Sequence, residues 1–526
     1  MLLDETPSET QTETHVNAVN GGATPVSPHA PSASDHDVAS RRMTQRRWLV
    51  WVGVALLLAL YVALWAVSAF DNTNPTDLDV FFVPDVRIAL AGHPLLIYSF
   101  RVEDYPIANG PISFLPLTLA AWLAAHFGWL GDPHLRRMVI FIVCSPFPLL
   151  VGYEAVRVVD RLSARTLRGV WRLLAYGVIA LSPELWHSAL YYGHIEQPIL
   201  VWLMLLGIRL LIERKPVWAG ALLGLALLTR TAAALPLLAL LLILARWRRW
   251  NTLARLLAGL AGTVALVMTP FLIADEHDVL YSLVTFRSSL PVGGGNLWGV
   301  LLGPAITSFA AQYDSTMTIG AALLLTVCVL ATRRDLDLDS PDLYGLLTLT
   351  MLCFPLLIKM LWPYYYLETY LFVAVWALAR PIPRPLSALG RGARQRGEPI
   401  RFWLRSAAQG AAGSEVIRWV CWGWWALGWF WPVAVLVAAQ VAEYGLSSNG
   451  YIAWVGPWSL INTLLLLGTL LTLLAMLLWG EPLRRRVEQV ALRLFVRIPG
   501  EGSGENVGEN DAPRGILIAD ASVASE

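Results

Sequence analysis

Two aspartates in the first long polar segment have the chemistry of a general base. Asp77 and Asp79 precede the stretch PDVRIALAG, which begins at Pro84 and ends at Gly92. Proline in the first turn and glycine just past the end are typical of a short helix. A carboxylate directly before such a helix could accept the proton of a substrate hydroxyl. The alternative is a hydrated loop in which the aspartates have no specific role.

A second candidate is the turn YYGHIEQP at residues 191–198, which links two apolar segments. His194 and Glu196 follow a pair of tyrosines there. Ionisable residues at the mouth of an apolar bundle are usually functional or paired, so we predict that both contribute to substrate binding. A turn whose polar groups simply satisfy one another is the alternative. The His-x-Glu spacing is too short and too common to indicate a metal site.

Two cations interrupt apolar sequence and could bind an anion. Arg230 divides the long apolar run 217–245, where it indicates either a phosphate ligand or a buried carboxylate partner. Lys359 precedes Tyr364 and Tyr365, which follow it closely in the sequence. A cation with aromatic faces suits a sugar bearing a phosphate, although an interfacial aromatic belt would have the same composition.

The elements that position these residues are predicted to be membrane helices. Hydrophobic residues make up 56% of the 526, and charged residues only 15%. That is too little charge for several water-soluble domains, so the chain is predicted to be all-α, a multi-spanning transmembrane helix bundle. A net charge of +1 gives no reason to expect nucleic acid as a partner. The absence of Walker, GxGxxG, GxSxG and HExxH motifs leaves ATP hydrolysis, dinucleotide chemistry and zinc proteolysis without a site.

A membrane-spanning helix needs about 20 apolar residues. Clear candidates cover 48–70, 138–156, 171–190, 197–212, 253–273, 316–332, 342–358, 364–380, 417–442 and 458–479. The run 217–245 is predicted to form two short helices, 217–229 and 231–245, that meet at Arg230. Two further apolar stretches that contain Pro and Gly, 111–130 and 297–312, are predicted to be interfacial or re-entrant, or an extra pair of crossings. The total is about 12 crossings.

Arginine clusters orient this bundle, because basic residues concentrate on the cytoplasmic side. With 12 crossings every cluster lies in the cytoplasm, both termini are cytoplasmic, and Asp77 and His194 share the outer face. The expected localisation is the plasma (inner) membrane, with an active site that faces outside. The expected organisation is a disordered tail (1–45), a catalytic membrane domain (46–380), an Arg-rich cytoplasmic linker (381–416), a two-helix membrane segment (417–480) and a cytoplasmic tail (481–526).

Taken together, these residues resemble the GT-C superfamily of polyprenyl-phosphate-sugar-dependent glycosyltransferases, and among them the bacterial, mannosyltransferase-like glycosyltransferase family 87. The resemblance covers roughly residues 48–380, and Ile107 departs from it where a second proline is common. The matching residues are Asp77-Leu78-Asp79-Val80-Phe81, Ala91-Gly92-His93-Pro94-Leu95-Leu96-Ile97-Tyr98, Tyr105-Pro106, Gly193-His194-Ile195-Glu196, Arg230 with Pro236, and Pro363-Tyr364-Tyr365-Tyr366.

The resemblance implies an inverting hexosyl transfer from a polyprenyl-phosphate sugar, with mannose as one candidate, to a glycan or glycolipid hydroxyl in a bacterial cell envelope. Asp77 is the first candidate for the base and Asp79 the second. The lipid phosphate is expected near Arg230, with the other binding residues drawn from His194, Glu196, Lys359, Tyr364 and Tyr365. Neither a metal nor a cofactor is expected, and the remaining partner is membrane lipid.

A transporter or flippase of lipid-linked or small polar solutes is the main alternative, because broken helices and an arginine within the membrane are features of both classes. Transporters more often have matching halves with paired interruptions, and this sequence has no such repeat. A membrane scaffold without catalytic activity is a third possibility.

Overall fold

A computed structural model describes most of the chain. The described residues are 33–70, 77–99, 106, 109–162, 169–186, 189–190, 192–286, 290, 292–293, 295–301, 304–380, 430–439, 441 and 457–495. The chain forms two compact units, Met1–Val52 and Gly53–Glu526. Helix α1 (Ala33–Phe70) begins in the first unit, and all of the other described helices belong to the second. Because α1 starts at Ala33, residues 33–45 of the predicted tail are helical; the predicted linker 381–416 lies outside the described residues.

Every regular element within these described ranges is helical, which confirms the predicted all-α fold. After α1 come η1 (Leu78–Phe82), α2 (Val83–Leu90), η2 (Pro94–Ser99), η3 (Pro111–Ser113), α3 (Phe114–His126), α4 (Pro133–Cys144), α5 (Pro146–Leu162), α6 (Val170–Ala180), α7 (Pro183–Trp186) and α8 (Glu196–Ile212). The second half contains α9 (Pro216–Leu227), η5 (Thr231–Ala233), α10 (Ala234–Arg246), α11 (Trp250–Leu280), η6 (Tyr281–Thr285), α13 (Leu297–Val300), α14 (Pro304–Thr332), α15 (Asp342–Leu357), η7 (Pro363–Tyr366), α16 (Leu367–Ala379) and α20 (Pro457–Phe495).

Five helices among the described residues are long and apolar enough to cross a membrane. They cover Trp48–Val67, Pro133–Leu162, Trp250–Thr285, Ala305–Thr332 and Ser459–Gly480. Several shorter apolar helices accompany them, among them Phe430–Ala439 within the predicted span 417–442. Large apolar side chains such as Leu266 and Ile273 point away from the protein and are about four-fifths exposed, at 78% and 81%. This outward apolar surface suits contact with lipid tails rather than water, and the chain is a membrane protein of several spans.

Two local predictions are confirmed. Helix α2 carries Pro84 in its first turn and is followed by Gly92, whose φ of +95° suits glycine. The apolar run 217–245 is divided at Arg230, which adopts an extended backbone (φ −156°, ψ 132°) between α9 and η5. The arginine therefore marks a true break in the helix.

Several predicted elements have boundaries that differ from the prediction. The predicted span 171–190 is interrupted, because α6 ends at Ala180 and Pro183 cannot continue a helix whose backbone N–H groups must donate. The predicted stretch 297–312 is not one element: α13 covers its start, and its remainder begins the 29-residue helix α14, which continues through the predicted span 316–332. Within 111–130, η3 and α3 form the apolar helix Pro111–His126, which is shorter than the five long apolar helices.

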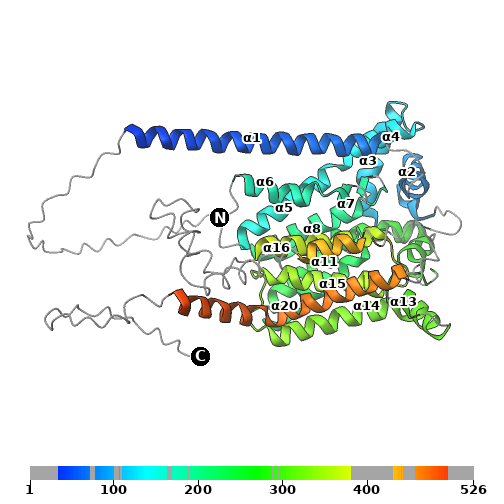
Figure 1. Ribbon diagram of the computed structural model, residues 1–526. Coiled ribbons are helices and arrows are strands. Elements are labelled where there is room, and N and C mark those ends of the chain that lie inside the picture. The colour runs from blue at the N-terminus through cyan, green and yellow to red at the C-terminus, as the bar shows by residue number, and fades with distance from the viewer. Residues whose placement is uncertain are drawn as a thin grey trace, which may run out of the picture. The chain divides into compact units, whose positions relative to one another are not determined.

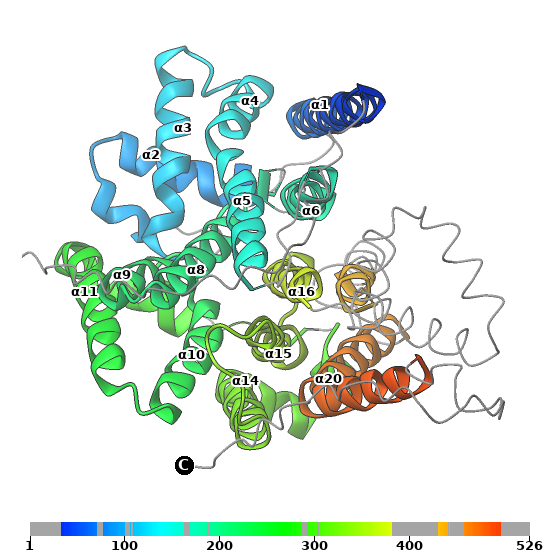
Figure 2. The same cartoon turned by 90° about the vertical axis from the view of Figure 1, so that its left-hand side faces the viewer.

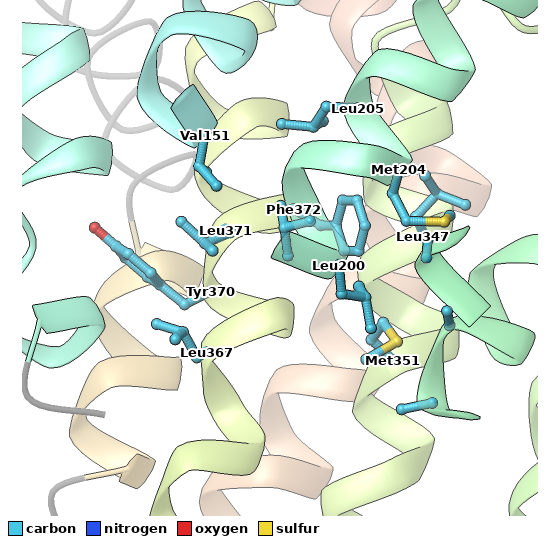
Figure 3. Packing of buried hydrophobic residues seen from close by; sticks show 14 of the residues in the cluster. Val151, Leu200, Met204, Leu205, Leu347, Met351, Leu367, Tyr370, Leu371 and Phe372 are labelled. Carbon is cyan, nitrogen blue, oxygen red and sulfur yellow. The ribbon is translucent and has the colours of Figure 1, made fainter. Parts of the chain in front are cut away.

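The core that supports the site is formed by α5, α8, α15 and α16. Figure 3 shows this packing, in which Val151 of α5 lies near Leu371 of α16. Leu200 and Met204 of α8 lie near Met351 and Leu347 of α15, respectively. In Figures 1 and 2 the same four helices run side by side. Figure 2 also shows α2, α3 and α4 grouped together next to α5.

Helices α9 and α11 lie unusually close to one another because glycines face the crossing. A Cβ added at Gly220 of α9 would stand 2.0 Å from the carbonyl oxygen of Leu256, and one added at Gly259 of α11 would stand 2.1 Å from that of Val217. Small residues at such crossings let two backbones approach. This crossing fixes α9, the helix that leads directly to Arg230.

Candidate active site

Asp77 stands at the start of the π-helix η1, on the side of the first loop that faces the bundle. Leu78 and Phe82 of η1 are 0% and 2% exposed and anchor the element, whereas the Asp77 side chain is 22% exposed. The backbone that carries this carboxylate is therefore anchored, while the carboxylate itself stays partly exposed. Such short π-helical segments are frequent at functional sites.

His194 joins Asp77 to Glu196. Its Nε2 lies 3.1 Å from Oδ2 of Asp77, and its Nδ1 lies 2.7 Å from Oε1 of Glu196. Burial favours the neutral ring, but the charge of Glu196 and the hydrogen bonds that the ring donates to both carboxylates outweigh it and raise the pKa of His194 to about 9. At neutral pH the ring is an imidazolium that donates from both nitrogens. Within the described residues, the second oxygen of Asp77 accepts no hydrogen bond.

The close approach of the two segments depends on Gly193. Its φ of +88° lies in the left-handed region, and a Cβ there would stand 2.8 Å from Cβ of Leu78. The glycine therefore permits both the turn before His194 and the contact of this turn with η1. This is the physical basis of the Gly-His-Ile-Glu sequence.

An aromatic turn covers the histidine. The Tyr364 ring stacks on the His194 ring with centroids 3.6 Å apart, and Phe82 meets the same ring edge-on at 5.7 Å. The carbonyl of Tyr364 accepts a 2.6 Å hydrogen bond from Nε2 of Gln197. A cation beneath an aromatic face is stabilised by the ring quadrupole, so this turn favours the charged form of His194.

Arg230 forms a second buried cluster next to the first. Its Nη1 donates to Oε1 of Glu368 at 2.7 Å, and both residues are nearly inaccessible, at 3% and 1% exposure. The guanidinium also lies over the rings of Tyr365 (4.6 Å) and Phe354 (5.7 Å). Because the Tyr364 and Tyr365 rings are in contact, with centroids 5.0 Å apart, the two clusters adjoin. Of the two partners predicted for Arg230, the structure contains the buried carboxylate.

The guanidinium of Arg230 retains hydrogen-bonding capacity. In the part of the chain that the structure describes, only its Nη1 has a hydrogen-bond acceptor. An arginine carries donors on three nitrogens, so this buried cation keeps donors that an anion could use. The second oxygen of Glu368 is likewise buried and unbonded within those residues.

Asp79 is held by two arginines. Its Oδ1 accepts from Nη2 of Arg136 and its Oδ2 from Nη2 of Arg137, each at 2.5 Å. Burial alone would raise the pKa of Asp79, but the hydrogen bonds from Arg137 and Arg136 hold it below its ordinary value. Both carboxylate oxygens are engaged, so Asp79 attaches η1 to the first turn of α4.

Lys359 is placed elsewhere. It is 1% exposed, its Nζ donates to the carbonyl of Ala311 at 3.3 Å, and its backbone N–H donates to Oδ2 of Asp314 at 3.2 Å. These two contacts are with α14, and its carbonyl accepts from the backbone N–H of Gly293 at 2.7 Å. The structure brings together Asp77, His194, Glu196 and Tyr364, and places Arg230 and Tyr365 beside them.

The sequence alone did not identify several charged residues of this region. Arg136 and Arg137 had a usable signal, because two arginines directly before an apolar segment on the expected outer side depart from the inside-positive bias. Glu368, in the first turn of the apolar helix α16, carried a different signal, because an ionisable residue within an apolar span is usually paired or functional. Asp85 of α2 is fully buried and has no hydrogen-bond partner among the described residues, and burial raises its pKa to about 8. Nothing in the sequence distinguishes it from a surface aspartate.

Among the described residues, no group of three or more His, Cys, Asp and Glu side chains is arranged to hold a metal ion. In the cluster of Asp77, His194 and Glu196, each ring nitrogen of His194 already faces a carboxylate.

No protein-family model matches the sequence, and no curated protein matches it significantly. Among solved structures, the chain is similar to ArnT from Cupriavidus metallidurans, crystallised with undecaprenyl phosphate. The similarity covers 84% of this chain and 78% of that chain, with 16% sequence identity and a TM-score of 0.40.

Proposed function

We propose that this protein is a membrane glycosyltransferase that moves a sugar from a polyprenyl-phosphate donor to an acceptor hydroxyl, with Asp77 as the general base. The observation that carries the proposal is the arrangement at Asp77: buried His194 holds one carboxylate oxygen, and Glu196 holds His194 from behind. The other oxygen is left for a substrate. A base whose orientation is fixed by a second residue is typical of catalytic sites.

The reaction follows from these positions. The acceptor hydroxyl gives its proton to the unbonded oxygen of Asp77 while its own oxygen attacks the anomeric carbon. The bond from that carbon to the phosphate oxygen breaks, and its electron pair stays on the polyprenyl phosphate. Attack from the face opposite the leaving group inverts the anomeric configuration. Asp77 is preferred over Asp79 because both oxygens of Asp79 are engaged by arginines.

Arg230 is proposed to hold the lipid phosphate. It is buried, permanently charged and has donors that no described residue uses. Tyr364 and Tyr365 connect the two clusters, since Tyr364 stacks on His194 and Tyr365 lies under Arg230, and we propose that they line the site at which the sugar binds. We further propose mannose as a candidate sugar, a glycan or glycolipid of a bacterial cell envelope as the acceptor, and an active site at the outer face of the plasma membrane with both termini in the cytoplasm.

The test uses the purified protein in lipid vesicles with a radiolabelled polyprenyl-phosphate sugar and candidate acceptors. Asp77→Asn keeps the shape but removes the basicity, so transfer should fall by about 10²–10⁴-fold while donor binding is retained. Glu276→Gln, at an exposed acid outside the site, is the charge-matched control. Movement of the labelled lipid across the vesicle membrane without transfer would support a flippase instead. Full transfer activity in Asp77→Asn would remove the proposed mechanism.

A further inference from the structure

Helix α20 reaches the aromatic turn through one amide. Asn462 is completely buried, and its Nδ2 donates to Oη of Tyr366 at 2.6 Å and to the carbonyl of Gly295. One turn earlier on the same helix, Oγ of Ser459 accepts from the backbone N–H of Gly295 at 2.6 Å. A primary amide has two N–H donors, and Asn462 uses one on each of these two segments.

The three tyrosines of this turn have separate contacts. Tyr364 stacks on His194, Tyr365 lies over Arg230, and Tyr366 accepts from Asn462. They belong to the single 3-10 turn η7, so a shift of one changes the position of the others. The hydrogen bond from α20 is therefore made to the same rigid unit that covers both charged clusters.

We propose that Asn462 is a positioning residue of the active site, and that it acts by fixing the turn that stacks Tyr364 on His194. The catalytic part of this inference rests on the proposed function; the positional part does not. Sequence reasoning separates the C-terminal segment 417–480 from the catalytic domain 46–380. According to this inference, the two segments act as one functional unit, because α20 fixes the turn whose Tyr364 ring covers His194.

The energetics favour a positional role. Buried polar groups in an apolar setting are costly unless they are hydrogen-bonded. The Nδ2 of Asn462 donates to two acceptors on elements that are distant in sequence, while its Oδ1 is buried and accepts no hydrogen bond from the described residues. A hydrocarbon side chain could fill the same space but would fix neither acceptor. Fixing one orientation of packed elements is a well-attested use of a buried polar residue.

The test measures the accessibility of His194 directly, with no need for a substrate. Diethyl pyrocarbonate modifies accessible imidazoles in their neutral form, so all variants are compared at one pH near the His194 pKa of about 9. Mass spectrometry of the peptide that contains His194 gives the rate of modification. Asn462→Leu should raise that rate several-fold, and Tyr366→Phe, which removes only the hydroxyl, should raise it less. The matched control is Thr469→Val on the same helix, since the Thr469 hydroxyl bonds only to its own helix at Leu465 and should leave the rate unchanged. Tyr364→Ala, which removes the cover itself, sets the upper limit.

The double variant Asn462→Leu/Tyr366→Phe should expose His194 no more than Asn462→Leu alone, because the hydrogen bond that Tyr366→Phe removes is already absent in Asn462→Leu. If Asn462→Leu does not fold, the milder single variant Tyr366→Phe still tests the inference. Unchanged modification of His194 in the folded variants, with clear exposure in Tyr364→Ala, would overturn the inference.

Activity gives the second measurement. If the protein transfers sugar, Asn462→Leu should lower kcat by up to about 10²-fold, the usual cost of a small misplacement at a catalytic site. If the wild-type protein transfers no sugar but Asn462→Leu exposes His194, the positional inference stands and the proposed function fails. If sugar transfer is found and His194 exposure does not change, the function stands and the role of Asn462 falls.

Discussion

Oδ2 of Asp77 and Nε2 of His194, which are far apart in the sequence, lie 3.1 Å from each other. The contact joins the first loop to the turn before α8, and it gives the aspartate a charged partner from a buried position. Because of this contact, the protonation of His194 affects the stability of the fold as well as the proposed reaction at Asp77.

The pH dependence of stability follows from the raised pKa of His194. Its pKa of about 9 in the folded protein lies above the ordinary value of 6.5, so the imidazolium stabilises the fold fully below pH 6.5. That contribution is lost as the pH rises from 6.5 through 9. Thermal unfolding in detergent should therefore show a Tm that falls across this interval in the wild type and falls less in His194→Gln. Equal slopes for the two proteins would contradict the charged state of His194.

The ion pairs of Asp79 predict a structural phenotype. Asp79→Asn leaves two buried arginines without their carboxylate, which should cost about 3–5 kcal/mol, the usual result of removing one partner from a buried pair. The loss would appear as a lower Tm or a reduced yield of folded protein. Asp77→Asn, in a more exposed setting, should lose activity with a smaller change in Tm. A stable but inactive Asp79→Asn would instead make Asp79 the base.

Arg230 and Glu368 allow stability to be separated from ligand binding. Either Arg230→Met or Glu368→Leu should destabilise the fold by about 3–5 kcal/mol, whereas the double variant should recover most of that loss. If Arg230 also holds the lipid phosphate, the stable double variant should still use the donor poorly, with a raised KM. Arg230→Lys should recover only part of donor use, because the planar fork is lost. Normal donor kinetics in the double variant would leave Arg230 with a structural role alone.

Gly193→Ala tests the close approach of the two segments that form the site. Backbone strain at a positive φ costs about 1–3 kcal/mol, and the added Cβ would also stand 2.8 Å from that of Leu78. Gly92→Ala is a matched control: its φ is also positive, at +95°, but the added Cβ meets nothing within 4 Å. Transfer activity should fall much more in Gly193→Ala than in Gly92→Ala. Equal effects would mean that backbone strain, and not the contact with Leu78, is what matters.

Labelling of single cysteines tests the orientation. In a background without other cysteines, Asp35→Cys and Gln395→Cys should react with an impermeant maleimide only after the cells are opened. His93→Cys, exposed next to α2, should react in intact cells. The expectation follows from the arginine clusters, which favour the cytoplasmic side. Reaction of residue 35 or 395 in intact cells would contradict the predicted orientation of the chain in the membrane.

The sequence was sufficient for the features that depend on local chemistry. The break at Arg230 could be predicted because a charge within an apolar run disrupts a span, and α2 could be predicted because Pro84 and Gly92 mark its ends. The end of α6 was missed because the composition stays apolar past Pro183, which hides the change in backbone geometry. Apolar composition indicates that a segment is buried, but it does not indicate the residue at which a helix ends.

The partners of the charged residues could not be derived in the same way. Asp79 meets Arg136 and Arg137, and Arg230 meets Glu368, across long separations in sequence. Such pairs depend on how helices pack, and one sequence contains no signal that joins them. Asn462 is a further example, because an amide in an apolar helix gives no indication of the element to which it will bond.

The two adjoining clusters at the candidate site hold three carboxylates, on Asp77, Glu196 and Glu368, and two cations, on His194 and Arg230, which leaves one negative charge when all are ionised. In the proposed reaction Asp77 becomes neutral at the moment when the leaving phosphate gains a charge. Negative charge therefore relocates from the protein to the lipid, and the dry interior holds the same total before and after. Turnover then requires two separate departures, the lipid phosphate into the bilayer and the proton into water, and the slower of these can set the rate.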